Sequence, residues 1–253
     1  MMAETIDGIV VSSEDPCFAL SVSDILYGDM LTDRIASIRG LADAFPRLRF
    51  VCVRNDSMDA TMFAAAAEAA ADTGLGMILE SADPVCLAAG IAAVPGHSPL
   101  ICMTDADRLG ETAILSVARG CPVSVPGGDV ESLMENVETV EGYGVGGIVL
   151  CPGYGNMKGC LETNTDLCRL ASRGFEQACH PILTRTWSGE YALSVASISV
   201  MRGGALMVLD EDHHQEDDEG EVVIMKIAKD EGGEECYEYV EDEDLQEAVF
   251  EKF

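Results

Sequence analysis

The sequence predicts an α/β protein of the (β/α)8 TIM-barrel type, and three observations support this prediction. Short apolar runs alternate with helical stretches, eight runs in all between residues 18 and 212. Nearly every run is apolar throughout, which is typical of parallel strands that are buried on both faces. A chain of 253 residues also has the length that such barrels occupy as one domain.

The first four units each pair an apolar run with a helix that has a recognisable start or end. The predicted strands cover residues 18–24, 49–56, 76–81 and 99–105. The first helix, over 31–45, places Ile35, Ile38, Leu41 and Ala42 on one side. Asp59 is expected to cap the second helix, which ends at Gly74. Pro84 lies in the first turn of the third helix, where a missing N–H costs nothing.

The second half of the chain repeats the pattern. Its predicted strands cover residues 122–128, 147–153, 180–187 and 204–212. Its helices cover 129–144, with Asp129 as the cap, and roughly 159–177 and 189–203. An open doubly wound sheet is the alternative architecture. The first strand-to-helix turn, SVSDILYGDM, lacks the G-x-G-x-x-G phosphate loop of a dinucleotide-binding sheet, which favours the closed barrel.

The pattern breaks after residue 212, which divides the chain into a barrel over 1–212 and an acidic α+β extension over 213–253. We expect a polar linker, a hairpin over about 221–240 that turns near 230–233, and a short helix over 243–253. No eighth helix is predicted, so the extension either covers that gap or forms a separate module. The extension resembles the end of a short acidic bacterial family of unknown function.

The formal net charge is −30, and more than half of it lies at the end of the chain. Residues 210–253 hold 19 acids against three lysines. Such a surface repels phosphate backbones and anionic lipids, so the composition disfavours nucleic-acid and membrane partners, and we expect neither. An acid-rich host proteome explains the charge as well as an acidic docking role does.

Ten cysteines are scattered along the chain without any C-x-x-C pair. Cys52, Cys102 and Cys151 lie inside apolar runs, where a free thiol behaves as a small hydrophobic group. No metal site is predicted from the cysteine and histidine spacing. The chain starts with the acidic MMAETIDG and has no apolar stretch long enough to span a bilayer, so we expect a reduced, cytoplasmic protein suited to an anaerobic cell.

Several segments resemble the barrel domain of the large (gamma) subunit of the corrinoid iron-sulfur protein, in the acetyl-CoA decarbonylase/synthase family. The segments are GLADAF, SADPVCLAAGIAAV, SPLICMTDADRLGETAILSVARGCPVSV, DVESLMENVETVEGYGVGGIVLCPG and GEYALSVASISVMRGGALMVLDE. The resemblance runs over roughly residues 7–212. It implies a role in one-carbon metabolism and the acetyl-CoA pathway, in which a methyl group is carried on cobalt.

The same resemblance also sets an expectation for cofactors and partners. The family has an amino-terminal four-cysteine iron-sulfur module and a carboxyl-terminal corrinoid module, and we recognise neither in this sequence. The resemblance therefore implies a barrel-only relative that binds no cofactor alone, with a corrinoid (cobalamin) presented by a partner. That partner would be another barrel subunit or a corrinoid-carrying protein.

The candidate site lies at the carboxyl ends of the strands, where barrel active sites are found. Polar residues follow the strands there: Asp24, Asn55, Asp56, Glu80, Ser81, Thr104, Asp105, Arg185, Thr186 and Asp210. Among them, Asn55, Asp105 and Arg185 offer an amide, a carboxylate and a guanidinium to a pterin-like or carboxylated ring edge. The alternative is that each one caps a helix or pairs with a neighbouring charge.

Two further features of this end leave alternatives open. Gly153 and Gly155 either let backbone N–H groups approach a ligand or permit a left-handed turn. Arg185 either binds phosphate or stacks against Trp187. His97 is expected to be structural, on the opposite face of the barrel.

Three functions follow from these observations, and the catalytic residues stay unassigned. The first is methyl transfer by docking a corrinoid or a partner barrel. The second is a pterin-dependent methyltransferase in which Asp105 orients the ring. The third is a non-catalytic interaction scaffold whose acidic extension is the working part. No nucleophile motif such as G-x-S-x-G occurs.

Overall fold

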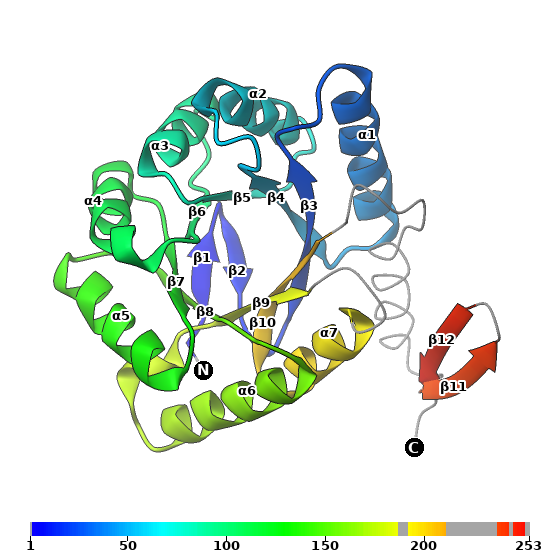
Figure 1. The fold of residues 1–253 in the computed structure, drawn as a ribbon, viewed down its shortest axis with the longest axis vertical. Helices are drawn as coiled ribbons and strands as arrows, with labels where there is room; N and C mark the ends of the chain where they lie inside the picture. Colours follow the sequence, from blue (N-terminus) through cyan, green and yellow to red (C-terminus); the bar gives the residue numbers. More distant parts are fainter. Residues whose placement is uncertain (1, 187–191, 211–236, 243–244, 251–253) are drawn as a thin grey trace.

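The predicted closed barrel is confirmed by a computed structural model, which describes residues 2–186, 192–210, 237–242 and 245–250. Eight parallel strands pair in chain order, and the last pairs with the first to close the ring (Figure 1). The barrel strands are β3 (Cys17–Ser23), β4 (Leu48–Arg54), β5 (Gly76–Ser81), β6 (Leu100–Met103), β7 (Val123–Gly127), β8 (Ile148–Pro152), β9 (Ile182–Thr186) and β10 (Gly204–Leu209).

Helices connect the strands and surround the ring in Figure 1. They are α1 (Asp29–Ala44), α2 (Ala60–Ala71), α3 (Pro84–Ala93), α4 (Leu109–Arg119), α5 (Val130–Gly142), α6 (Met157–Ser172) and α7 (Ala192–Met201), with 3-10 turns η1 (Ala106–Arg108) and η2 (Glu176–Cys179). Asp59 and Asp129 cap α2 and α5 as predicted. The helix predicted over 159–177 is shorter than expected, because Gly174 adopts a left-handed φ of 87° and separates α6 from η2.

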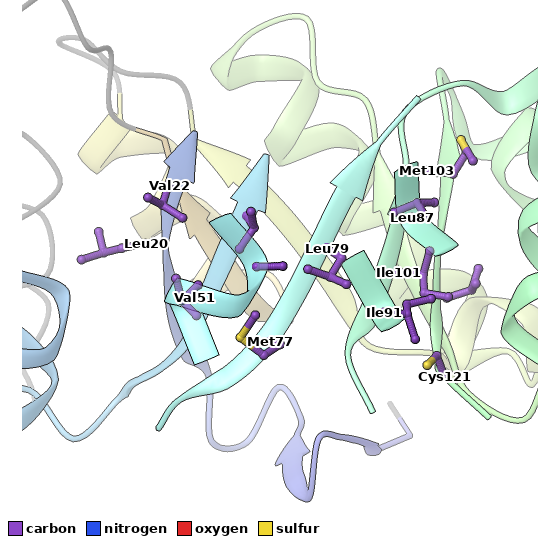
Figure 2. Packing of buried hydrophobic residues seen from close by; sticks show 14 of the residues in the cluster. Leu20, Val22, Val51, Met77, Leu79, Leu87, Ile91, Ile101, Met103 and Cys121 are labelled. Carbon is purple, nitrogen blue, oxygen red and sulfur yellow. The ribbon is translucent and has the colours of Figure 1, made fainter. Parts of the chain in front are cut away.

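Strand side chains divide between two apolar layers, because successive residues of a strand point to opposite faces. One set faces the helices, and Figure 2 shows Leu20, Val51, Leu79 and Ile101 packing there. The other set fills the barrel interior, and includes Ala19, Phe50, Ile78, Leu100, Val149, Leu183 and Val208. The core is aliphatic, as the low aromatic content predicts.

A two-stranded hairpin that the sequence analysis missed closes the amino-terminal end of the barrel. It consists of β1 (Glu4–Ile6) and β2 (Ile9–Val11), which lie inside the ring in Figure 1. Ile6 and Val11 are fully buried against the interior layer. The turn is Asp7-Gly8, with φ of 51° and 80°, and an Asp-Gly pair between β-branched residues is a strong hairpin signal.

Asp7 also joins this hairpin to the barrel. Its carboxylate lies 2.6 Å from His97 Nδ1 and accepts hydrogen bonds from the backbone N–H of Ser98 and of Met77. The structural role predicted for His97, on the face opposite the site, is therefore confirmed. The hairpin leaves only the carboxyl-terminal end of the strands as the barrel mouth.

The predicted carboxyl-terminal helix over 243–253 is wrong where the structure describes it. Residues Leu245–Phe250 form β12, which pairs in antiparallel fashion with β11 (Tyr237–Asp242). Strand pairing overrides the local helix preference of this segment, as tertiary context often does. The predicted linker, the turn near 230–233 and the position of an eighth helix lie outside the described residues. None of the described helices has the length and apolar character needed to span a membrane.

Candidate functional site

The barrel mouth holds two guanidinium groups and two carboxylates that point inward from the strand ends. We call Arg54, Glu80, Arg185 and Asp210 the arginine–carboxylate cluster. Arg185 Nη1 lies 2.8 Å from Asp210 Oδ2, and Arg185 Nη2 forms an ion pair with Glu80 Oε2. Arg54 Nη1 lies 3.5 Å from Asp210 Oδ1. The cluster thus links β4, β5 and β9 with the end of β10.

The charges of the cluster are partly buried, and each guanidinium is paired with carboxylates that offset the cost of its burial. The side chain of Arg185 is 25% exposed, and those of Glu80 and Asp210 are less exposed. Burial of the Arg54 guanidinium lowers its pKa, but Asp210 and Asp56 raise the pKa by more, and the net shift is upward. Arg54 also contacts Asp56 at 3.0 Å. Both arginines are therefore paired with neighbouring carboxylates.

Three thiols form the floor beneath the cluster. Cys52, Cys102 and Cys151 come from β4, β6 and β8, alternate strands that contribute to one layer of a barrel interior. Arg185 Nη2 donates to Cys52 Sγ at 3.8 Å. Burial raises the pKa of Cys52 to about 11 and that of Cys151 to about 12, and raises the pKa of Cys102 well above its usual value. Burial thus favours the protonated thiols, which are poor nucleophiles at neutral pH.

We expect these thiols to make the fold sensitive to alkaline pH. Since the folded pKa values of Cys52 and Cys151 lie above the ordinary 9.0, the unfolded chain releases protons that the folded chain retains. The stability contribution is fully present below about pH 9 and is lost as the pH rises towards 11 to 12. Urea denaturation across this range should show a smaller decline for a variant with all three cysteines replaced by alanine. Equal declines in the two proteins would contradict the expectation.

A second polar group, which we call the Asp24 network, lies beside the cluster and contains Asp24, Asn55, Ser57 and Ser81. Asp24 Oδ2 accepts from Asn55 Nδ2 at 2.7 Å and from Ser57 Oγ at 2.6 Å. Asp24 Oδ1 accepts from the backbone N–H of Ser57 at 2.8 Å. Ser81 Oγ donates to Asn55 Oδ1 at 2.8 Å. Both ends of the Asn55 amide are thus engaged, and the loop between β4 and α2 is tied to β3 and β5.

Asp105 occupies a helix-capping position. It is the N-cap of η1, and its Oδ1 accepts from the backbone N–H of Asp107 at 3.0 Å. This is the capping alternative that the sequence analysis left open. The short polar side chain before a helix satisfies a backbone donor that has no partner within the helix.

The glycines of the β8–α6 loop do not form the left-handed turn that the sequence analysis considered, since neither Gly153 nor Gly155 has a positive φ. The N–H of Gly153 donates to Gly127 O at 2.7 Å, so it is not directed at a ligand. The loop is anchored by Tyr154, whose buried hydroxyl bonds to Asn164 and lies 3.4 Å from Thr184 Oγ1.

The structure therefore gathers the predicted site residues at one end of the barrel but not around one point. Asn55 belongs to the Asp24 network, Arg185 to the arginine–carboxylate cluster, and Asp105 and Gly153 lie at the ends of other strands. Arg54 was missed, although it follows Cys52 by two residues and must point to the same side of its strand. Trp187, the proposed stacking partner of Arg185, lies outside the described residues.

The donor groups of the described residues do not fit an iron-sulfur cluster or an axial ligand for cobalt. No three His, Cys, Asp or Glu side chains among them are placed to hold one metal ion. His97 contacts the hairpin at the amino-terminal end, and His180 lies 3.6 Å from both Glu4 and Glu141, also away from the mouth. No chemical step through such a group is therefore assigned to these side chains.

Curated relatives of this chain are subunits of corrinoid and acetyl-CoA enzyme systems. The corrinoid/iron-sulfur protein large subunit of Moorella thermoacetica is 28% identical over 209 residues, which is 76% of this chain and 46% of that protein. The acetyl-CoA decarbonylase/synthase complex subunit gamma of Methanosarcina acetivorans is 31% identical over 209 residues, covering 74% and 45%. The chain spans less than half the length of these relatives.

Solved structures similar to this chain share its fold at low identity. Dihydropteroate synthase from Thermus thermophilus has a TM-score of 0.69 and 12% identity, covering 91% of this chain and 99% of that one. A truncated 3-deoxy-D-arabino-heptulosonate 7-phosphate synthase from Thermotoga maritima has a TM-score of 0.65 and 11% identity, covering 90% and 91%. These similarities support the barrel architecture alone.

Two protein families match the chain, and their matches overlap over residues 201–218. Residues 201–253 match a family described as a protein of unknown function (DUF1292), in agreement with the resemblance of the acidic extension. Residues 13–218 match a family described as CO dehydrogenase/acetyl-CoA synthase delta subunit, which confirms the resemblance seen across the barrel. The greater part of this chain lies within the second match, and the chain belongs to the CO dehydrogenase/acetyl-CoA synthase delta subunit family.

Proposed function

We propose that this chain acts in one-carbon (methyl) transfer as an accessory barrel that docks a corrinoid-carrying protein or a partner barrel. The names of the curated relatives support the pathway, since they are subunits of a corrinoid/iron-sulfur protein and of acetyl-CoA decarbonylase/synthase complexes. The observation that carries the proposal is the internal pairing of the mouth. The inward-facing charges of the mouth form ion pairs with one another, so they are not free to bind a small ligand. A partner that contacts the outer surface of the mouth would not have to break these pairs.

The pairing disfavours a small polar ligand within the mouth. A ligand that used Arg185 would have to compete with Glu80 and Asp210, and separating a buried ion pair leaves an uncompensated charge. A ligand that used Asn55 would have to displace Asp24 or Ser81. In the proposed role these residues keep the mouth rigid and exclude water beneath a docked partner, while the corrinoid held by that partner supplies the methyl-transfer chemistry.

Co-elution tests the proposal. The purified full chain is mixed with methylcobalamin, and separately with a small-subunit-type barrel of the corrinoid iron-sulfur protein, before size-exclusion chromatography with corrinoid absorbance recorded. We expect co-elution with the protein partner or a changed corrinoid spectrum. Dihydropteroate synthase from Thermus thermophilus, which shares the fold, serves as the matched control. Failure of both mixtures would remove the proposal.

The pterin-dependent methyltransferase is the second candidate. The observation that favours it is the group of buried polar side chains at the strand ends, where Asn55 lies between Asp24 and Ser81. Titration calorimetry with methyltetrahydrofolate separates the candidates, because the accessory barrel is expected to give no heat of binding. Binding of methyltetrahydrofolate that Asn55→Ala abolishes, in a variant that is still folded at the assay temperature, would favour the methyltransferase.

A further inference from the structure

Exposed apolar side chains gather on one sector of the barrel mouth. The sector, which we call the apolar rim, contains Ile25, Tyr27, Met30, Met58, Met62 and Val85. All six follow the consecutive strands β3, β4 and β5, so they share one face of the barrel. They are six of the fifteen large apolar side chains exposed among the described residues. Single exposed apolar residues are ordinary, whereas several at the same end of consecutive strands are consistent with a contact surface.

Met58 is the outlier within the apolar rim. Its φ of 58° is a left-handed conformation that costs a non-glycine residue free energy, and its side chain is 61% exposed. The conformation is held by bonds on both sides, from Ser57 N to Asp24 and from Asp59 N to Ser57 Oγ at 3.0 Å. An exposed methionine makes few contacts within the folded chain that could offset the free-energy cost of this conformation. We expect the offsetting contacts to be made with another molecule.

The charges around the apolar rim define the kind of partner. Asp29, Asp56 and Asp59 are exposed, and they lie close in sequence to Met30 and Met58. The neighbouring cations are already paired, Arg54 with Asp56 and Arg108 with Asp83 and Glu111. The first lysine of the chain is Lys158, far from this sector in the sequence. The rim is thus an apolar surface bordered by carboxylates.

A second copy of this chain would be a poor occupant. It would bring the same carboxylates to the contact, and each copy carries a formal charge of −30. Like charges brought together across an interface cost free energy and oppose association. A surface with an apolar centre flanked by lysine and arginine side chains is the complementary one.

We propose that the apolar rim is the surface on which the partner protein docks, and that the partner presents an apolar centre flanked by basic side chains. This inference rests on the proposed function and names the surface it would use. Methionine side chains adapt to the shape of a partner, and Tyr27, which is 74% exposed, supplies a large amphipathic anchor. The Asp24 network becomes the support that holds Met58 in position.

Met58→Gly separates a binding role from a structural one. Glycine adopts the left-handed φ without strain, so the unfolding midpoint of this variant should equal or exceed that of the unaltered chain. The side chain is nevertheless lost, and we expect the Kd for the small-subunit-type barrel to rise roughly tenfold or more. Tyr27→Ala should show a rise of similar size. Phe175→Ala, at an exposed aromatic residue between α6 and η2, is the matched control and should bind normally.

Methyl signals of selectively labelled methionine provide a direct readout. On addition of the partner, the signals of Met30, Met58 and Met62 should shift or broaden, while that of Met201, exposed at the end of α7, should not. Binding should also weaken as NaCl rises from about 50 to 200 mM, because screening reduces attraction between exposed charges. Binding that does not depend on the NaCl concentration would contradict the proposal that basic side chains of the partner contact the carboxylates around the apolar rim.

The outcomes distinguish this inference from the proposed function. The unaltered chain, Met58→Gly and Tyr27→Ala could all bind the partner equally well. The apolar rim would then not be the docking surface, although the proposed docking function would remain supported. If the methyl signal of Met201 responds and that of Met58 does not, docking occurs elsewhere on the barrel. If the unaltered chain does not bind the partner, the proposed docking function and the assignment of the apolar rim are both contradicted.

Discussion

Arg185→Met should lower the free energy of unfolding by about 3–5 kcal/mol, the cost of breaking a buried ion pair by removing one partner. Methionine approximates the length of the arginine side chain but carries no charge. Among the residues that the structure describes, Glu80 then loses its ion-pair partner, and Asp210 keeps Arg54, 3.5 Å away. Urea denaturation at neutral pH measures the change.

The double variant Arg185→Met with Glu80→Gln is the control for this prediction. Replacing both partners with neutral groups leaves no uncompensated charge, so the double variant should recover a large part of the lost stability. The single variant Glu80→Gln should cost less than Arg185→Met, because Arg185 retains Asp210 at 2.8 Å. A loss below about 1 kcal/mol in Arg185→Met would show that the cluster behaves like a surface ion pair.

The strands of the barrel could be predicted closely because they depend on local sequence. Each is a short run of apolar residues, and β5 has the predicted bounds of 76 and 81. Closure into a ring followed from the number of units and the absence of a phosphate loop. The amino-terminal hairpin also had a local signal, since Asp7 and Gly8 stand between β-branched residues. That signal was present in the sequence but was not used.

The carboxyl-terminal strand β12 had no such local signal. Its residues Leu245–Phe250 favour a helix when taken alone, and their strand conformation depends on pairing with Tyr237–Asp242. Pairing between segments is a property of the folded chain. The misprediction therefore reflects a limit of local propensity rather than an overlooked motif.

The pairing of side chains at the mouth could not be read from the sequence for the same reason. Glu80 and Arg185 lie on β5 and β9, which are not adjacent strands, and they meet because the closed ring places inward-facing side chains on opposite sides of one interior. Sequence position identified the end of the barrel at which they lie. It gave no indication that the groups would bond to one another in place of a ligand.

The two polar groups of the mouth support one functional interpretation. The arginine–carboxylate cluster closes the centre, where a small ligand would bind in a barrel enzyme. The Asp24 network instead supports a loop that exposes Met58 at the edge of the mouth. The hydrogen bonds of the Asp24 network therefore stabilise the conformation of the loop at the outer surface. This arrangement fits contact with a protein better than binding of a small molecule in the interior.

Asp24→Ala should lower the free energy of unfolding by about 3 kcal/mol or more, and it should also weaken docking of the partner. The Asp24 side chain accepts three hydrogen bonds, from Asn55 and from the N–H and hydroxyl of Ser57. Asp24 is 1% exposed, so water cannot replace the carboxylate for all three donors. Urea denaturation measures the first effect, and titration with the small-subunit-type barrel measures the second.

Asp59→Ala is the matched control for stability and hydrogen exchange, because it removes an aspartate from the same loop and, within the fold, loses the cap of α2. Asp59 accepts from the N–H groups of Thr61 and Met62, and loss of such a cap costs about 1 kcal/mol. If the Asp24 network supports Met58, hydrogen exchange at Ser57 and Met58 should accelerate in Asp24→Ala more than in Asp59→Ala. Equal exchange in the two variants would mean that Met58 keeps its left-handed conformation without Asp24. The proposal that the Asp24 network holds Met58 in position would then be contradicted.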